Sequence, residues 1–327
     1  MPSRPATILL RTRPTLLISR LPAARHYSQS AEPLIRVTNV PAPNSGHIRV
    51  LEINRAPARN AISRALLANL RSEIDAIGSQ YGEGGEELPL PSRFGGAAGV
   101  DQKGPTRAVV LASAVDSCFC SGADLKERRG FTKDETDEFL SNLRSTLNAI
   151  ASLPVPTISA ISSIALGGGL ELALSTHLRV LTSNASVGLP ETKLGIIPGA
   201  GGTYRLPALI GLSRARDLII TGRRVSAPEA YFLGIADRLV EITEGGSEEE
   251  KKTLLERARR GALSEAVRLA GEICEGGPIA VRAALGAVGW AREEVENKLY
   301  ETVVGTEDRN EALKAFQEKR KPVFKGR

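Results

Sequence analysis

Apolar and polar residues alternate in two short segments near the start of the chain, residues 34–40 and 47–55. Alternation combined with many β-branched residues is typical of strands, and the proline, asparagine and glycine between the two segments predict a hairpin. Ser63 then precedes a stretch in which leucine and isoleucine recur at helical spacing. This pattern predicts a helix over residues 63–77 that Ser63 caps.

The middle of the chain alternates between strand-like and helical patterns. A continuous apolar run at 108–113 predicts a strand buried on both faces. A helix near 133–152, a strand at 157–162, a helix near 168–175 and a strand at 178–183 follow it. Such alternation predicts an α/β fold. Beyond about residue 205 helical spacing dominates to the end of the chain, apart from the strand-like ADRLVEI.

These patterns divide the chain into an α/β core at residues 34–225 and a helical C-terminal region at 226–327. A glycine-rich stretch at 82–104 interrupts the core and shows almost no periodicity. It is longer than most connections in compact domains and is typical of a mobile loop.

The net charge of +6 is concentrated at the N-terminus, where residues 1–31 hold five arginines and no acidic residue. This composition predicts a mitochondrial transit peptide over residues 1–27, and therefore a protein of the matrix. The remaining charges nearly balance, which gives no compositional case for nucleic acid binding. No stretch is apolar enough for a transmembrane helix, so no membrane partner is expected. Three cysteines are too few for a disulfide framework.

Three consecutive glycines, residues 167–169, follow an apolar segment and open one of the predicted helices. Glycines let the chain turn tightly, and the first N–H groups of a helix have no partner within it. Such a turn can bind an anion or an oxyanion. A glycine turn can equally serve close packing, but Glu171 follows within the first helical turn and favours a site.

Two further segments can complete that site. Glu191 follows Pro190, and the helix and returning strand between Glu171 and Glu191 have similar lengths, so both carboxylates can reach one pocket. The small-residue turn FCSGADLKE exposes backbone amides near Ala123. Two turns that each give one N–H to the same oxygen would stabilise a thioester enolate.

Other chemistries are less well supported. His47 and His177 lie in or beside predicted strands and are interpreted as surface or packed residues, which disfavours a Ser-His-Asp triad. Cys118 and Cys120 have no second cysteine pair, so no metal site is expected. The glycine-rich turns match neither the phosphate-binding P-loop nor the dinucleotide fingerprint.

Five segments together resemble the enoyl-CoA hydratase/isomerase (crotonase) superfamily, over about residues 34–327. They are NRAPARNAIS, FCSGADLKE, ALGGGLELAL, LPETKLGIIPGAGGTYRLP and DRNEALKAFQEKRKPVFKG. The resemblance implies an α/β fold, a crotonase-like spiral of ββα repeats with a helical C-terminal trimerisation region. It also implies a trimer or a dimer of trimers. Within the superfamily, the segments are most similar to the branch that hydrates 3-methylglutaconyl-CoA in leucine degradation.

The resemblance also implies roles for single residues. Glu171 and Glu191 would be the catalytic carboxylates, and the N–H groups of Ala123 and Gly168 would form the oxyanion hole. Contacts to coenzyme A are implied for Lys126 and, from a neighbouring subunit, for Tyr300 and Lys319. Coenzyme A would be part of the substrate, and no other cofactor is expected.

The expected reaction is hydration of a 2-enoyl-CoA, with 3-methylglutaconyl-CoA giving 3-hydroxy-3-methylglutaryl-CoA. The first alternative is a general short-chain enoyl-CoA hydratase of fatty-acid β-oxidation. A distal carboxylate on the acyl chain would need a cationic or donor-rich pocket end, which the sequence does not locate.

The second alternative is binding of AU-rich RNA, for which the same branch is noted. Arg64 and Arg71 share a face of the helix at 63–77, after Arg55 and Arg59. The same helix also carries acidic residues, so a solvated surface is the favoured interpretation.

Overall fold

The predicted hairpin is present, and it forms one end of the main sheet. β1 (Ile35–Pro41) pairs antiparallel with β2 (His47–Ile53), and the strands that follow β2 are all parallel to one another. They are β3 (Thr106–Ser113), β4 (Thr157–Ile161), β6 (Leu178–Thr182) and β9 (Arg238–Val240). Our computed structural model describes residues 32–82, 84–89, 104–243 and 248–327. Within these residues the sheet has six strands, in the order β1-β2-β3-β4-β6-β9.

Both the predicted leader and most of the predicted loop lie outside the described residues. The leader was placed at 1–27, and of the loop at 82–104 only residues 82, 84–89 and 104 are described. All the structure discussed below belongs to one compact unit, Pro33–Arg327. No described helix is long and apolar enough to cross a lipid bilayer.

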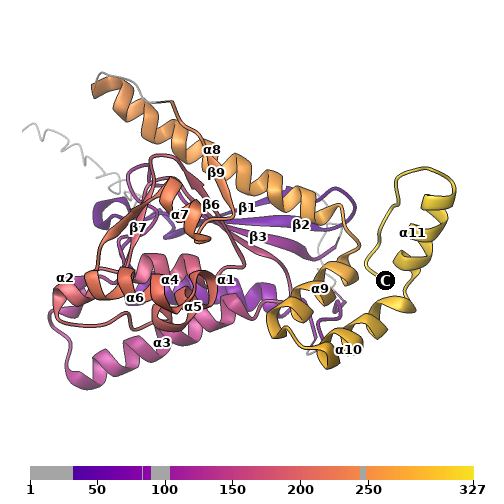
Figure 1. Ribbon diagram of the computed structural model, residues 1–327, viewed down its shortest axis with the longest axis horizontal. Helices are drawn as coiled ribbons and strands as arrows, with labels where there is room; N and C mark the ends of the chain where they lie inside the picture. The colour runs from indigo at the N-terminus through magenta and orange to yellow at the C-terminus, as the bar shows by residue number, and fades with distance from the viewer. Residues whose placement is uncertain (1–31, 83, 90–103, 244–247) are drawn as a thin grey trace, which may run out of the picture. The chain divides into compact units, whose positions relative to one another are not determined.

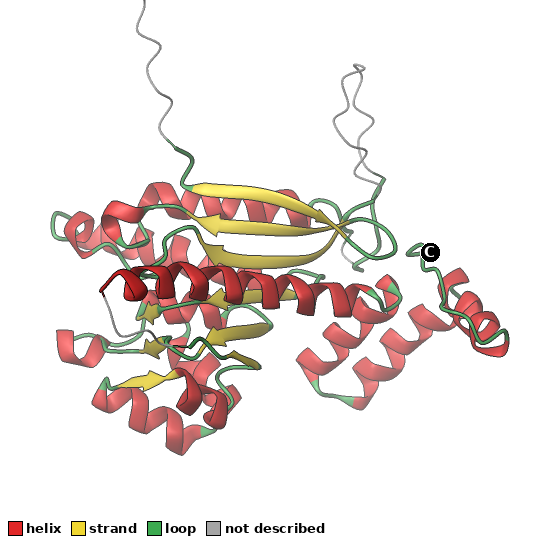
Figure 2. Ribbon diagram, turned by 90° about the horizontal axis from the view of Figure 1, so that it is seen from above, coloured by secondary structure: helices red, strands yellow, loops and turns green. Residues whose placement is uncertain are grey.

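Helices cover both faces of the sheet (Figures 1 and 2). α1 (Arg64–Gly78) and α3 (Lys133–Ala151) pack together over one face, and the Ser63 side chain caps α1 as predicted. α8 (Glu248–Cys274) lies across the other face. Alternate residues of β3 enter the two cores: Val109 and Leu111 face the first, and Ala108, Val110 and Ala112 face the core under α8. Every residue of β3 is buried, as its apolar run predicted.

A second, smaller sheet carries the chain toward the glycine triplet. It consists of three strands of three residues each, β5 (Ile164–Leu166), β7 (Ser186–Gly188) and β8 (Arg224–Ser226). β5 leads directly into α4 (Gly168–Leu174). The sequence did not predict these strands, because three residues are too few to show an alternating pattern.

The remaining described helices are short, or they belong to the C-terminal part of the chain. They are α2 (Leu125–Arg128), α5 (Gly202–Ile210), α6 (Leu212–Thr221), α7 (Ala227–Leu233), α9 (Pro278–Trp290), α10 (Glu293–Val304) and α11 (Glu307–Gln317), with 3-10 turns at Ala56–Ala58 and Glu191–Leu194. The sequence analysis predicted a separate helical region from residue 226 onward. In the structure, β9 belongs to the main sheet and α8 covers one face of that sheet, although both follow residue 226. The layered part of the fold therefore extends to Cys274.

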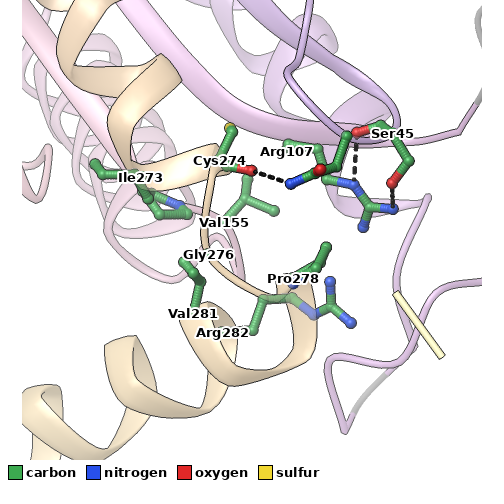
Figure 3. A pocket seen from close by; sticks show the side chains of 11 residues that line it. Ser45, Arg107, Val155, Ile273, Cys274, Gly276, Pro278, Val281 and Arg282 are labelled. Carbon is green, nitrogen blue, oxygen red and sulfur yellow. Dashed lines mark hydrogen bonds between the residues drawn. The ribbon is translucent and has the colours of Figure 1, made fainter. Parts of the chain in front are cut away.

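The described part of the glycine-rich stretch ties α9 to the main sheet. Glu87 accepts hydrogen bonds from Arg107 of β3 and from Arg282 of α9, the latter at 2.9 Å. Arg107 also donates to the carbonyl oxygen of Ser45 at 3.1 Å, beside a small cavity that Arg282 lines (Figure 3). Because both guanidinium groups are buried, Glu87 supplies the negative charge that their burial requires.

Candidate active site

Steric restrictions require glycine at two of the three consecutive positions, and the remaining glycine lies in van der Waals contact with a neighbouring turn. Gly167 has a φ of +55°, and its N–H donates to the carbonyl oxygen of Gly188. A Cβ on Gly169 would lie 2.1 Å from the carbonyl oxygen of Cys120, so no side chain fits there. A Cβ on Gly168 would lie 3.4 Å from the backbone nitrogen of Ala123. The start of α4 is therefore packed directly against the segment 120–123.

Backbone pairing holds Ala123 beside this helix. Ile62 pairs with Ala123 as a short parallel bridge, in which the N–H of Ile62 donates to Gly122 and that of Asp124 donates to Ile62. Gly122 has a φ of +95°, and a Cβ there would approach the carbonyl oxygen of Leu166 to 2.8 Å. The turn can lie this close to α4 only because it contains glycine.

The N–H groups of Ala123 and Gly168 have no hydrogen-bond acceptor among the described residues. Gly168 is the first residue of α4, where a helix leaves its N–H groups unpaired. Two unpaired donors on neighbouring turns form the geometry that binds a developing oxyanion. The structure thus brings together the two positions that the sequence singled out for this role.

Glu171 is buried and held by two backbone donors. Its side chain points from the first turn of α4, and the residue is 2% exposed. Oε1 accepts hydrogen bonds from the N–H groups of Ala200 at 2.7 Å and Gly202 at 2.9 Å. Burial raises the pKa of Glu171, and the two N–H donors oppose that rise by stabilising the anion.

Glu191 lies close to the glycine triplet and is 8% exposed. It begins the 3-10 turn after Pro190, and a Cβ on Gly167 would lie 3.2 Å from its Oε1. Its Oε2 is buried and has no hydrogen-bond partner in the described part of the chain. Burial is the main reason that the pKa of Glu191 rises to about 7, and the negative charge of Glu171 raises it further.

One cavity of about 840 Å³ unites these four groups, since Ala123, Gly168, Glu171 and Glu191 all line it. Lys126, Tyr300 and Lys319 do not line this cavity. Lys126 is exposed on α2, Tyr300 is 67% exposed on α10, and Lys319 follows α11. Among the described residues, no three His, Cys, Asp or Glu side chains gather as a metal site.

The comparison with protein families decides the class of this site. The model of the enoyl-CoA hydratase/isomerase family matches residues 98–327. The chain belongs to the enoyl-CoA hydratase/isomerase family. It is therefore an enzyme of the hydro-lyase type that acts on a coenzyme A thioester, as the sequence predicted.

Individual relatives of this hydratase agree with the family assignment. A Pyricularia oryzae protein named methylglutaconyl-CoA hydratase 1, mitochondrial, is 70% identical over 315 residues, which cover 93% of this chain and 90% of the relative. The human methylglutaconyl-CoA hydratase, mitochondrial, is 39% identical, over 92% of this chain and 81% of the relative. The crystal structure of a Bacillus anthracis enoyl-CoA hydratase has a TM-score of 0.72 at 37% identity, and it covers 90% of this chain and 100% of the other. The predicted crotonase-like fold is confirmed.

The cavity of this hydratase also contains polar residues that the sequence analysis missed. Arg144 and Asn148 of α3 line it, as does Tyr204 of α5. Leu140, Arg144 and Asn148 recur every four residues and so share one face of α3. Polar residues at this spacing are also typical of a solvated helix face, so the sequence alone did not single them out.

The two histidines of the described chain are packed within the hydratase fold, as expected. His47 is buried, and its Nε2 lies 3.1 Å from the hydroxyl oxygen of Thr106. Nδ1 of His177 accepts a hydrogen bond from the backbone N–H of Thr157 at 3.0 Å. Neither histidine lines the cavity.

Three of the four arginines considered for RNA binding are engaged within the protein. Arg55 pairs with Asp124, Arg64 with Glu135, and Arg71 with Asp75. A phosphate backbone would have to compete with these carboxylates for each guanidinium group.

Proposed function

We propose that the enzyme adds water across the α,β double bond of 3-methylglutaconyl-CoA to give 3-hydroxy-3-methylglutaryl-CoA, a step of leucine degradation. The observation that carries the proposal is one cavity in which two buried carboxyl groups face two unpaired backbone N–H groups. The names of the relatives from Pyricularia oryzae and human support the choice of acyl group.

The backbone donors would act on the thioester carbonyl. When hydroxide adds to the β-carbon, negative charge develops on the carbonyl oxygen as an enolate forms. The N–H groups of Ala123 and Gly168 would accept this charge in hydrogen bonds, and one such donor typically contributes about 2.7 to 4 kcal/mol. Because neighbouring segments fix both turns, little reorganisation is needed during the reaction.

The two carboxyl groups would divide the proton transfers. Glu171 receives two backbone N–H bonds, which favour its anion, so it would orient a water molecule and take its proton. The resulting hydroxide bonds to the β-carbon. Glu191, whose pKa is near 7 and whose Oε2 has no described partner, would deliver its proton to the α-carbon. Both the hydroxide and the net proton added to the substrate thus come from one water molecule. Transfer of a proton from Glu171 to Glu191 through solvent restores the starting state.

This division of roles predicts a bell-shaped pH dependence of kcat/KM for hydration. Glu191 must be protonated to act as the acid, so the rate should fall about tenfold per pH unit above about pH 7. Glu171 must be ionised, so the rate should also fall at low pH, below a pKa that burial raises above its ordinary value. Initial rates between pH 5 and 9 measure both limbs. A rate that stays constant from pH 6 to 9 would contradict the role of Glu191.

The reaction as proposed involves no redox step, and coenzyme A enters as part of the substrate. We also propose that the enzyme works in the mitochondrial matrix as a trimer or a dimer of trimers. The mitochondrial names of the relatives support the location. Exposed apolar side chains on the C-terminal helices, such as Val288, Trp290 and Phe316, support association between subunits. In such an assembly, Tyr300 and Lys319 would contact the coenzyme A bound by a neighbouring subunit, and Lys126 would contact it within the same subunit.

A comparison of substrates tests the function. Residues 28–327 are assayed with 3-methylglutaconyl-CoA and crotonyl-CoA by the loss of enoyl-thioester absorbance. A clearly higher kcat/KM for 3-methylglutaconyl-CoA is expected. A higher value for crotonyl-CoA would instead identify a general short-chain hydratase, and no turnover of either thioester would refute hydration altogether.

A further inference from the structure

Arg144 occupies an unusual position in the cavity. It comes from the middle of α3, and its Nε donates to the carbonyl oxygen of Gly199 at 2.7 Å. The peptide group that joins Gly199 to Ala200 also donates its N–H to Glu171. A single peptide group therefore separates this guanidinium from the carboxyl group of Glu171. The hydrogen bond to Gly199 holds the guanidinium against that peptide group.

The charge of Arg144 has no carboxylate partner among the described residues. No Asp or Glu oxygen of the described chain lies within 4.0 Å of it, whereas Arg55 and Arg64, for example, are paired with Asp124 and Glu135. Only its Nε is used in a described hydrogen bond, so four of its five N–H donors remain for a ligand.

Asn148, one helical turn farther along α3, adds a second set of donors. Its Oδ1 accepts from Nη2 of Arg205 at 2.6 Å and from the hydroxyl of Tyr204 at 3.3 Å. Because arginine can only donate, these bonds fix the side-chain amide with its oxygen toward Arg205. The amide nitrogen therefore turns its two N–H groups away from that pair, and no described acceptor takes them.

We propose that Arg144 and Asn148 form a receptor for a carboxylate at the far end of the acyl chain. The inference rests on the proposed function, because it concerns the substrate of the same cavity. In a glutaconyl chain, the distal carboxyl carbon is two carbon–carbon bonds of about 1.5 Å beyond the β-carbon. A third carboxylate is thereby brought near Glu171 and Glu191. A fixed cation at the cavity wall offsets the repulsion, and a guanidinium group matches the two oxygens of a carboxylate.

Arg128 is the other arginine that lines the cavity, and it fits this role less well. It belongs to α2, which directly follows the Ala123 turn, and its guanidinium lies 5.8 Å from the ring centre of Phe139. Because Arg128 follows Ala123 by only five residues, we assign it to the thioester end of the cavity rather than to the distal carboxylate. Arg144, by contrast, lies close enough to Glu171 for its charge to stabilise the anion of that residue.

Binding of two saturated acyl thioesters tests the receptor without catalysis. Glutaryl-CoA has a distal carboxylate, valeryl-CoA has the same number of acyl carbons without one, and neither can be hydrated. Isothermal titration calorimetry of the wild-type enzyme should show tighter binding of glutaryl-CoA. The Arg144→Gln variant should lose about 10- to 100-fold in affinity for glutaryl-CoA, the range of a charged hydrogen bond. Its affinity for valeryl-CoA should change by less than about threefold, which also shows that the variant is folded.

The matched control is Arg128→Gln, which should change both affinities by the same factor. If Arg144→Gln lost affinity for glutaryl-CoA and valeryl-CoA equally, Arg144 would contact the coenzyme A portion of the ligand. If its affinity for glutaryl-CoA were unchanged, Arg144 would contact neither the coenzyme A portion nor the distal carboxylate. Both results overturn the inference. A wild-type enzyme that hydrates 3-methylglutaconyl-CoA while Arg144→Gln keeps its glutaryl-CoA affinity refutes the receptor alone. A selective loss in the variant, combined with a wild-type enzyme that does not hydrate 3-methylglutaconyl-CoA, refutes the proposed substrate alone.

Discussion

Replacing Glu191 by glutamine is expected to lower kcat for hydration by about 10²- to 10⁴-fold, the usual contribution of a positioned acid. Glutamine has nearly the same shape, but its amide cannot deliver a proton to the α-carbon. The fold should tolerate the change, because Oε2 of Glu191 has no described hydrogen-bond partner to lose. Removing a buried carboxyl group whose pKa burial has raised should even stabilise the protein slightly at alkaline pH, where that group must ionise within the cavity.

Loss of enoyl-thioester absorbance measures the rate, and thermal unfolding checks the fold. Glu171→Gln should be equally inactive, since its amide oxygen can still accept from Ala200 and Gly202 but cannot take a proton from water. Glu138→Gln is the matched control, because Glu138 is exposed on α3 and does not line the cavity. It should keep the wild-type rate. Turnover by Glu191→Gln at the wild-type rate would refute the proposed acid.

The larger elements of this fold were predictable because their patterns are long enough to read. The hairpin, the capped helix α1 and the fully buried strand β3 each follow from a local pattern of six residues or more. The small sheet could not be predicted in this way, because β5, β7 and β8 are only three residues each and form by pairing with distant segments. The placement of β9 in the main sheet also depends on its pairing with β6, which no local pattern reveals.

The chemistry of the site was more predictable than its shape. The glycine triplet, the small-residue turn and the two glutamates could be singled out because catalysis of this kind needs those residue types. Arg144 and Asn148 could not, because polar residues on a helix are usually solvated, and only the packing of α3 against the 198–204 segment turns them toward the cavity. The roles of Lys126, Tyr300 and Lys319 remain predictions, since two of them depend on a second subunit.

Replacing Gly169 by alanine should abolish most activity by displacing the oxyanion hole. The added Cβ would lie 2.1 Å from the carbonyl oxygen of Cys120 and 3.0 Å from its Cβ, so α4 or the segment 120–123 must shift. Either movement separates the N–H of Gly168 from that of Ala123. Loss of one oxyanion donor typically lowers kcat by about 10²- to 10³-fold. Overpacking of this kind also costs about 1 to 3 kcal/mol in the free energy of unfolding.

The matched control is Gly271→Ala in α8, where an added Cβ would meet no atom within 4 Å. Alanine favours helix by about 1 kcal/mol over glycine, so this variant should be slightly more stable and should keep the wild-type kcat. Rates are compared well below both melting temperatures, so that unfolding does not contribute. A Gly169→Ala enzyme that is folded and fully active would contradict the proposal that the N–H groups of Ala123 and Gly168 bind the thioester oxygen together, because the added methyl group forces one of their two segments to shift.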